Sequence, residues 1–296
     1  MNNLSAYLIG DTIKSFREYK KLTIEELSEG VCTEEELIEF EKEVSYPDLE
    51  TLNLLLKKLN VDLSYFFNVA SRSSINYANA VIRLINRYKR DWDYDRIQEI
   101  IEKELENPIF QTDQLKQFLI WHQGICKFYL DKDLSKALEL LYESIDITNK
   151  SRNDFNERET EILTSIAILH KESGNFEEAI TLFKESLNYL ENLPDILDPR
   201  GKIRVYFGLS QALTEVGKFE ESLEYCKKGI EYCITHELIY LLSSLYYQSG
   251  ENLIKLSRKE EGIQYINSAI YILKVQENKK FIKIIENEKD KLLQEW

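Results

Sequence analysis

The chain has 296 residues, of which 43% are hydrophobic and 30% are charged, and its formal net charge is −14. With only 10 Gly and 4 Pro, the composition suits an all-α protein and argues against a sheet fold built on tight turns. The acidic balance opposes nonspecific binding of nucleic acid by the molecule as a whole. No apolar run reaches the roughly 18 residues of a membrane span, and the first residues lack the basic segment of a signal peptide. We therefore expect a cytoplasmic protein with no membrane partner.

Residues 1–68 are predicted to form a separate unit of five short helices. The first spans 7–20, and the second begins at Thr23, which forms a capping box with Glu26. The third is capped by Thr33 and ends near residue 42. The fourth is predicted to carry Leu49, Leu52, Leu55, Leu56 and Leu59, and residues 61–67 close the unit. The tight turn between the second and third helices predicts a helix-turn-helix.

The segment 160–193 is predicted to be a helical hairpin that turns at Gly174 and Asn175. One hairpin cannot cover its own apolar stripe, so it needs similar neighbours. The position where the second helix packs closely on the first recurs at Ile97, Ala137, Ala179, Ser222 and Gly262. Seven residues further on come Glu104, Ser144, Ser186, Gly229 and Ala269, again mostly small. The pattern resembles the tetratricopeptide repeat, whose usual period is about 34 residues.

The expected fold is all-α. It combines an N-terminal phage-repressor-like helix-turn-helix domain with a right-handed superhelical array of about five degenerate tetratricopeptide repeats and a C-terminal capping helix. The predicted ranges are 1–68 for the helix-turn-helix domain, 69–77 for a linker, 78–276 for the repeats and 277–296 for the capping helix.

A more specific resemblance rests on residues of the first unit. Gly10, Ile13, Lys14, Arg17, Leu22, Thr23, Leu27, Ser28, Phe40, Glu41, Tyr46 and Pro47 resemble the phage-repressor-type domain of bacterial regulators. In that family Arg17 and Glu41 would form a buried ion pair. Together with the repeats, the chain resembles the PlcR-type peptide pheromone receptors, a quorum-sensing family of Gram-positive bacteria. The resemblance implies a homodimeric transcription regulator that binds a short signalling peptide in the groove of its repeats and a double-stranded DNA operator through its first unit.

The third helix would read DNA, yet its predicted solvent face is acidic. Residues 1–70 contain 7 Lys and Arg against 14 Asp and Glu, a formal charge of −7. DNA binding normally gains from basic groups that neutralise phosphates, so this surface should be repelled, although a Glu can accept a hydrogen bond from cytosine. The candidate DNA contacts are Lys14, Lys21, Thr33, Glu34, Glu35, Ile38, Glu39 and Lys42, with Lys20, Lys57 and Lys58 as further candidate phosphate contacts. The alternative is an acidic solvated face on a fold that has lost DNA affinity.

Residues 71–90 contain five basic residues and no acidic one. Guanidinium groups on one face of this predicted helix could clamp a peptide carboxylate, and Asn amides could bond its backbone. Corresponding positions of later inner helices would continue the surface, although packing between repeats is an equally valid interpretation for each residue. The candidate peptide contacts are Asn79, Arg83, Asn86, Lys89, Arg90, Gln123, Tyr129, Thr164, Lys171, Arg204, Phe207, Gln211, Tyr247, Gln248 and Glu251.

Other functional classes find less support in the sequence. The main rival is a protein-interaction scaffold with a degenerate acidic helix-turn-helix that does not bind DNA. An enzyme is not expected, because no Gly-rich phosphate loop or nucleophile motif is present. The four cysteines are expected to be reduced. His122 and Cys126 share a helix face but lack further ligands, so we expect no metal and no cofactor.

Overall fold

The computed structural model describes residues 7–71 and 73–295 of the chain. Residues 1–6 of the predicted first unit, Arg72 of the predicted linker and Trp296 of the predicted cap lie outside the described residues. The prediction of an all-α fold is confirmed: within the described ranges the only extended pairing is an isolated bridge between Tyr7 and Ser71. Across the same ranges, no helix combines the length and the apolar character needed to cross a membrane.

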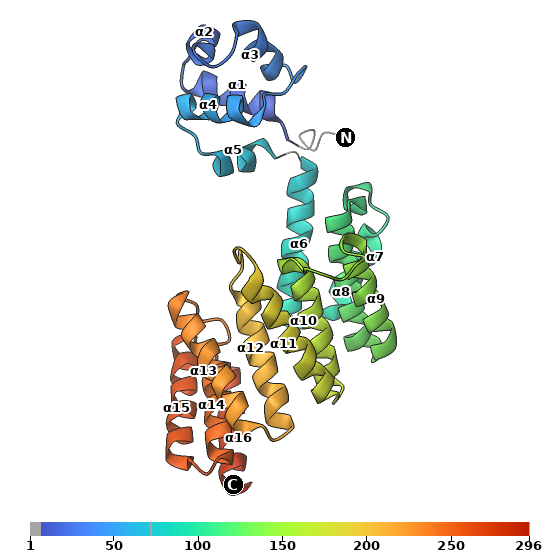
Figure 1. The fold of residues 1–296 in the computed structure, drawn as a ribbon, viewed down its shortest axis with the longest axis vertical. Coiled ribbons are helices and arrows are strands. Elements are labelled where there is room, and N and C mark those ends of the chain that lie inside the picture. The colour runs from blue at the N-terminus through green and yellow to red at the C-terminus, as the bar shows by residue number, and fades with distance from the viewer. Residues whose placement is uncertain (1–6, 72, 296) are drawn as a thin grey trace. The chain divides into compact units, whose positions relative to one another are not determined.

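The chain divides into two compact units (Figure 1). Unit 1 contains residues 1–93 and 106–110, and unit 2 contains 94–105 and 111–296. The helices of unit 1 are α1 (Ile9–Tyr19), α2 (Ile24–Ser28), α3 (Glu34–Glu41), α4 (Leu49–Leu59), α5 (Leu63–Ala70) and α6 (Ser73–Asp91). The segment 69–77, expected to be a linker, is therefore mostly helical, because α5 continues into it and α6 begins within it.

Local sequence signals fix the ends of the helices in unit 1. The Thr23 hydroxyl accepts a hydrogen bond from the Glu26 amide at 3.1 Å, and the Glu26 carboxylate accepts one from the Thr23 amide at 2.7 Å, as predicted. A second capping box joins Thr33 and Glu36 at the start of α3. The Asp48 carboxylate caps α4. These reciprocal bonds satisfy amides that a helix start otherwise leaves without partners.

The core of unit 1 is built from the apolar stripes of its first five helices. Its fully buried members include Ile13, Leu27, Leu37 and Phe66. The predicted leucines all lie on α4, where Leu52, Leu55, Leu56 and Leu59 are buried. Leu49 is 64% exposed, because it occupies the first turn of α4 beside the cap and precedes the buried stripe that begins at Leu52.

The ion pair expected between the first and third helices is present. Arg17 Nε and Nη2 donate to the two carboxylate oxygens of Glu41 at 2.6 and 2.7 Å, and Arg17 Nη1 donates to the Leu22 carbonyl at 3.1 Å. Glu41 is buried, and these charge-assisted bonds raise the pKa of Arg17. Arg17 therefore ties α1 to α3 and to the turn that precedes α2.

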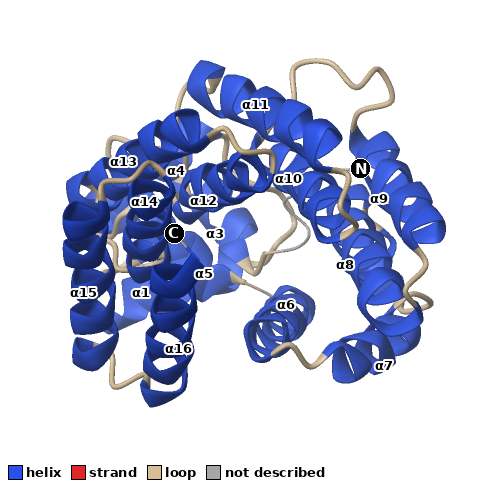
Figure 2. Ribbon diagram, turned by 90° about the horizontal axis from the view of Figure 1, so that it is seen from below, coloured by secondary structure: helices blue, strands red, loops and turns tan. Residues whose placement is uncertain are grey.

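The helices of unit 2 form consecutive hairpins. They are α7 (Tyr94–Glu104), α8 (Asp113–Asp131), α9 (Leu134–Thr148), α10 (Glu157–Glu172), α11 (Phe176–Asn192), α12 (Arg200–Glu215), α13 (Phe219–Thr235), α14 (Leu242–Lys255), α15 (Lys259–Val275) and α16 (Lys279–Glu295), while a short 3-10 helix, η2 (Pro108–Gln111), precedes α8. Figure 2 shows α8, α10, α12 and α14 along the inner side of an arc, with α9, α11, α13 and α15 outside them.

The predicted repeat positions are all buried. Ile97, Ala137, Ala179 and Ser222 are at most 1% exposed, and Gly262 is also buried. At the last hairpin α14 and α15 come close enough that a Cβ on Gly262 would lie 2.6 Å from the Gly250 carbonyl oxygen. The expected capping helix is α16, whose Ile285 and Leu292 cover the apolar cluster of that hairpin. The prediction of tetratricopeptide-like repeats is therefore confirmed.

Replacement of Glu41 by Gln should lower the free energy of unfolding of unit 1 by about 3 kcal/mol, because it leaves the Arg17 charge without its buried partner. Hydrogen exchange of the α1 and α3 amides in the full chain measures this change. Glu39→Gln, an exposed change on the same helix, should leave exchange near its original rate. Equal protection in the Glu41 and Glu39 variants would show that the pair does not hold α1 to α3.

Gly262→Ala should destabilise the last hairpin by about 1–3 kcal/mol, because the added methyl overpacks the contact between α14 and α15. Gly201→Ala is the matched control, since a Cβ at that helical position meets nothing within 4 Å. The control should be neutral or gain up to about 1 kcal/mol from the helix propensity of Ala. Urea unfolding of both variants measures the difference, and a Gly262 variant as stable as the control would contradict the close approach.

Candidate functional site

The exposed face of α3 is acidic, as predicted from the sequence. Glu34, Glu35, Ile38 and Glu39 are all exposed. The hydroxyl of Thr33 is already used by the capping box, where it accepts from the Glu36 amide and donates to the Glu36 carboxylate. These bonds from Thr33 lower the pKa of Glu36, so its negative charge stays at the helix start.

The two capping boxes bear directly on how this unit can meet a phosphate. Free amides at a helix N-terminus are ready anion sites. In α2 and α3 each capping box uses two of these amides, and the carboxylates of Glu26 and Glu36 place negative charge beside the rest. Basic side chains are therefore the better candidates for contacts to a nucleic-acid backbone.

Most of the predicted basic contacts lie on the surface of unit 1. Lys14, Lys21 and Lys42 are exposed. Lys58 has a structural role instead, because its ammonium donates to the carbonyl oxygens of Glu26 at 2.8 Å and Glu29 at 2.5 Å at the end of α2. Because these bonds cap the end of α2, the Lys58 ammonium is less available for the predicted contact to phosphate.

Residues 73–90 of the basic window lie in α6 of unit 1. Its buried residues are Ala78, Val81 and Ile85, and the predicted polar face is opposite: Asn79, Arg83 and Arg90 are exposed, while Asn86 and Lys89 are half-buried. The sequence-predicted peptide contacts are thus divided between two units, because the remaining ten lie in unit 2.

Polar side chains of unit 2 bridge adjacent inner helices. Lys171 of α10 donates to the Gln211 amide oxygen of α12 at 2.7 Å. Arg204 of α12 donates from Nε to the Tyr240 hydroxyl at 3.3 Å, and its Nη1 lies 3.7 Å from the Glu161 carboxylate of α10. Glu251 of α14 pairs with Lys255 one turn later. These half-buried groups form the polar part of the inner surface.

Two residues predicted to face a ligand are buried among helices. Thr164 is 3% exposed and its hydroxyl donates to the Thr160 carbonyl, while Gln248 is 4% exposed and donates to Thr214 Oγ1 and to Glu251. Their burial argues against direct contact with a ligand, because the inner helices also pack against each other and bury part of the shared face. Phe207 and Tyr247 are half-buried and pack against neighbouring apolar clusters.

Aromatic packing fixes the start of unit 2. Tyr129 stacks on Tyr94 with ring centroids 4.4 Å apart and an interplanar angle of 2°. Burial raises the pKa of Tyr129 to about 12, and Glu172 adds to this shift, so the hydroxyl stays protonated at neutral pH. Gln123 is half-buried on the same helix.

The candidate His–Cys pair of α8 is part of the packing. His122 is buried, with Nδ1 2.9 Å from the Phe118 carbonyl oxygen, and burial raises the pKa of the Cys126 thiol to about 12. A protonated thiol is a poor metal ligand. Among the described residues, no group of three or more His, Cys, Asp or Glu side chains could hold a metal.

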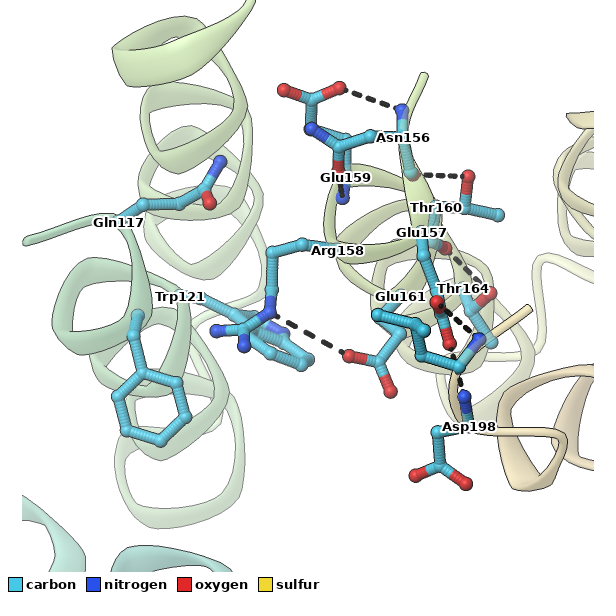
Figure 3. A network of polar contacts seen from close by, with 12 residues as sticks. Gln117, Trp121, Asn156, Glu157, Arg158, Glu159, Thr160, Glu161, Thr164 and Asp198 are labelled. Carbon is cyan, nitrogen blue, oxygen red and sulfur yellow. Dashed lines mark hydrogen bonds and ion pairs between the residues drawn. The ribbon is translucent and has the colours of Figure 1, made fainter. Parts of the chain in front are cut away.

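Arg158 and Glu161 of α10 are inner-surface residues that sequence reasoning missed. The Arg158 guanidinium lies 5.7 Å from the Trp121 ring centroid and faces Glu161, as Figure 3 shows. The signal was available: moving back three residues from Thr164 along the same helix face gives Glu161, and a further three gives Arg158. The predicted inner face of this helix begins at Thr164 and therefore leaves out the residues of its first turns.

Comparisons with known proteins agree with this architecture. Residues 82–294 match the family model described as the RNPP family C-terminal domain. No curated relative matches the sequence significantly.

Solved structures match along almost the whole chain. PlcR of Bacillus thuringiensis, solved in complex with the peptide PapR7 and DNA, is 25% identical, with a TM-score of 0.79 over 97% of this chain and 99% of that chain. Its apo form matches at 23% identity, a TM-score of 0.67, and 95% and 99% coverage. ComR from S. thermophilus, solved with DNA and its signalling peptide ComS, matches at 17% identity, a TM-score of 0.63, and 96% and 99% coverage. The latter two likenesses concern the fold.

Proposed function

Because the chain belongs to the RNPP family, we propose that it is a quorum-sensing transcription regulator that binds a short signalling peptide and operator DNA. The observation that carries the proposal is the presence of both parts in one chain: a helix-turn-helix with an exposed α3, and an array whose inner helices expose polar side chains. The similarity to PlcR in its complex with peptide and DNA supports the same assignment over 97% of the chain.

The DNA-binding part of the proposal assigns base reading to α3. Its exposed Glu34 and Glu35 can accept hydrogen bonds from cytosine N4 groups in the major groove. Contacts to phosphates would come from Lys14, Lys21 and Lys42. Two copies in a homodimer would double these contacts and read two half-sites. Nonspecific affinity should be low, because the acidic face of α3 repels phosphates.

The peptide-binding part of the proposal uses the inner surface of unit 2. Arg204, Lys171 and Gln211 offer charge and amide groups there. An extended peptide needs donors and acceptors for its backbone as well as apolar contacts for its side chains. Binding to this surface is proposed to change the population of two states of the chain, which differ in affinity for DNA.

The proposed activity is binding and not catalysis, and it would take place in the cytoplasm, where operator DNA is found. The acidic face of α3 favours one alternative, a protein-interaction scaffold whose helix-turn-helix does not bind DNA. The two functions differ in a measurable way, because only the regulator selects a DNA sequence.

Selection of duplexes from a random-sequence library by the full chain, at low salt and with peptides that co-purify from its source cells, should enrich one two-fold symmetric sequence. Glu34→Gln combined with Glu35→Gln should reduce discrimination against other sequences and raise nonspecific affinity, since two negative charges leave the reading face. Anisotropy of labelled duplexes measures both effects.

The matched control for this experiment is Glu286→Gln with Glu295→Gln, which changes the net charge equally on exposed positions of α16. It should leave sequence discrimination unchanged. If no sequence is enriched with or without peptide, the regulator proposal fails and the scaffold alternative is favoured.

A further inference from the structure

Two arginine side chains on the inner surface of unit 2 share one glutamate carboxylate. Arg158 and Glu161 come from α10, and Arg204 comes from α12. One oxygen of Glu161 lies 3.8 Å from Arg158 Nε and the other lies 3.7 Å from Arg204 Nη1. Both distances exceed a hydrogen bond, whereas the bidentate pair of Arg17 and Glu41 closes to 2.6 and 2.7 Å.

Neutral groups hold the two guanidinium groups in place. Arg158 lies over the Phe118 and Trp121 rings, with its central carbon 5.5 and 5.7 Å from their centroids. The Trp121 ring is itself fixed, because its Nε1 donates to Ser165 Oγ at 2.9 Å. Arg204 is held by the Tyr240 hydroxyl at 3.3 Å. Within the described chain, neither guanidinium donates a hydrogen bond to a carboxylate.

Other nearby carboxylates have their own partners. Asp198 accepts two hydrogen bonds from Arg200 at 2.7 Å, and Glu157 accepts bonds from the Leu197 and Asp198 amides at 3.0 and 2.8 Å. Figure 3 shows Glu157 directed to this loop and away from Arg158. Glu161 is therefore the carboxylate that the two arginines share, and the cluster carries one more positive than negative charge.

We propose that Arg158 and Arg204 form a subsite for a carboxylate of the bound peptide, and that Glu161 holds its place until the peptide displaces it. The inference rests on the proposed peptide-binding function and names its ligand chemistry. Arginine forks bind carboxylates through paired N–H donors, and both forks here are half-buried and already oriented by aromatic groups. The incoming carboxylate is either the peptide C-terminus or an Asp or Glu side chain, which share this chemistry.

Displacement of Glu161 by a ligand carboxylate should cost little free energy, because both of its contacts to the arginines are long. The side chains of Arg158, Glu161 and Arg204 are 42%, 23% and 27% exposed, and partly exposed pairs that lie beyond hydrogen-bond distance contribute little stability. A ligand carboxylate that reaches both guanidinium groups gains charge-assisted hydrogen bonds that Glu161 does not make. Glu161 would then act as an internal competitor and lower the affinity of the subsite.

The test uses the full chain and a library of heptapeptides labelled with fluorescein at the N-terminus, read by anisotropy. The strongest binders are resynthesised in neutral forms, one with an amidated C-terminus and one with Glu→Gln or Asp→Asn. One of the two neutral forms should bind at least about tenfold more weakly. Loss on amidation assigns the carboxylate to the C-terminus, and loss on side-chain replacement assigns it to an acidic residue.

Variants of the chain connect this preference to the subsite. Arg158→Gln should make the charged and neutral peptides bind equally, and Glu161→Gln should tighten binding of the charged form severalfold. Such a gain cannot arise from misfolding. Arg152→Gln is the matched control: this guanidinium also lies over a ring, Tyr142 at 4.7 Å, and pairs with Asp146, but it follows the outer helix α9. Arg152→Gln should leave the affinities for the charged and the neutral peptide unchanged.

Two results would overturn the inference. If library peptides bind but their charged and neutral forms bind equally to the original chain, the carboxylate subsite is wrong and the proposed function stands. If no peptide binds, both the subsite and the peptide-binding function are wrong.

Discussion

The close approach of paired helices in unit 2 is the constraint on which the rest of that unit depends. Ala137, Ala179, Ser222 and Gly262 are buried at equivalent positions of successive hairpins. Small side chains let the outer helices lie directly against the inner ones, so each hairpin presents its inner helix to the next. Buried hydrogen bonds also fix the positions of the helices along one another. The Asn252 amide of α14 donates to the Ser222 hydroxyl of α13 at 2.7 Å and accepts from the Thr214 hydroxyl of α12 at 2.8 Å. The inner surface exists because this stacking repeats.

The fold could be predicted from the sequence largely because its signals are local and periodic. Capping residues such as Thr23 mark helix starts, and the recurring small positions mark the hairpins. The segment 69–77 was harder to assign, because it lacks strong apolar periodicity although α5 ends and α6 begins in it.

The candidate site was harder to predict, because helix register gives the face of a residue and not its depth. Thr164 and Gln248 share the inner register, yet both are buried where adjacent inner helices meet. The contact between Glu161 and Arg204 joins α10 and α12 across 43 residues of sequence. Such pairing across repeats has no local signal. By contrast, the charge of the α3 face was evident from sequence, and the capping-box carboxylates of Glu26 and Glu36 add negative charge at two helix starts.

The central claim is that peptide binding to the inner surface of unit 2 changes the affinity of α3 for operator DNA. Thermodynamic linkage between the two ligands tests this claim most directly. Labelled operator DNA would be titrated with the full chain with and without saturating peptide, and labelled peptide would be titrated with and without saturating DNA. The account predicts that each ligand changes the affinity of the other by the same factor, on the order of 5- to 150-fold. DNA affinity that is unaffected by saturating peptide would contradict it.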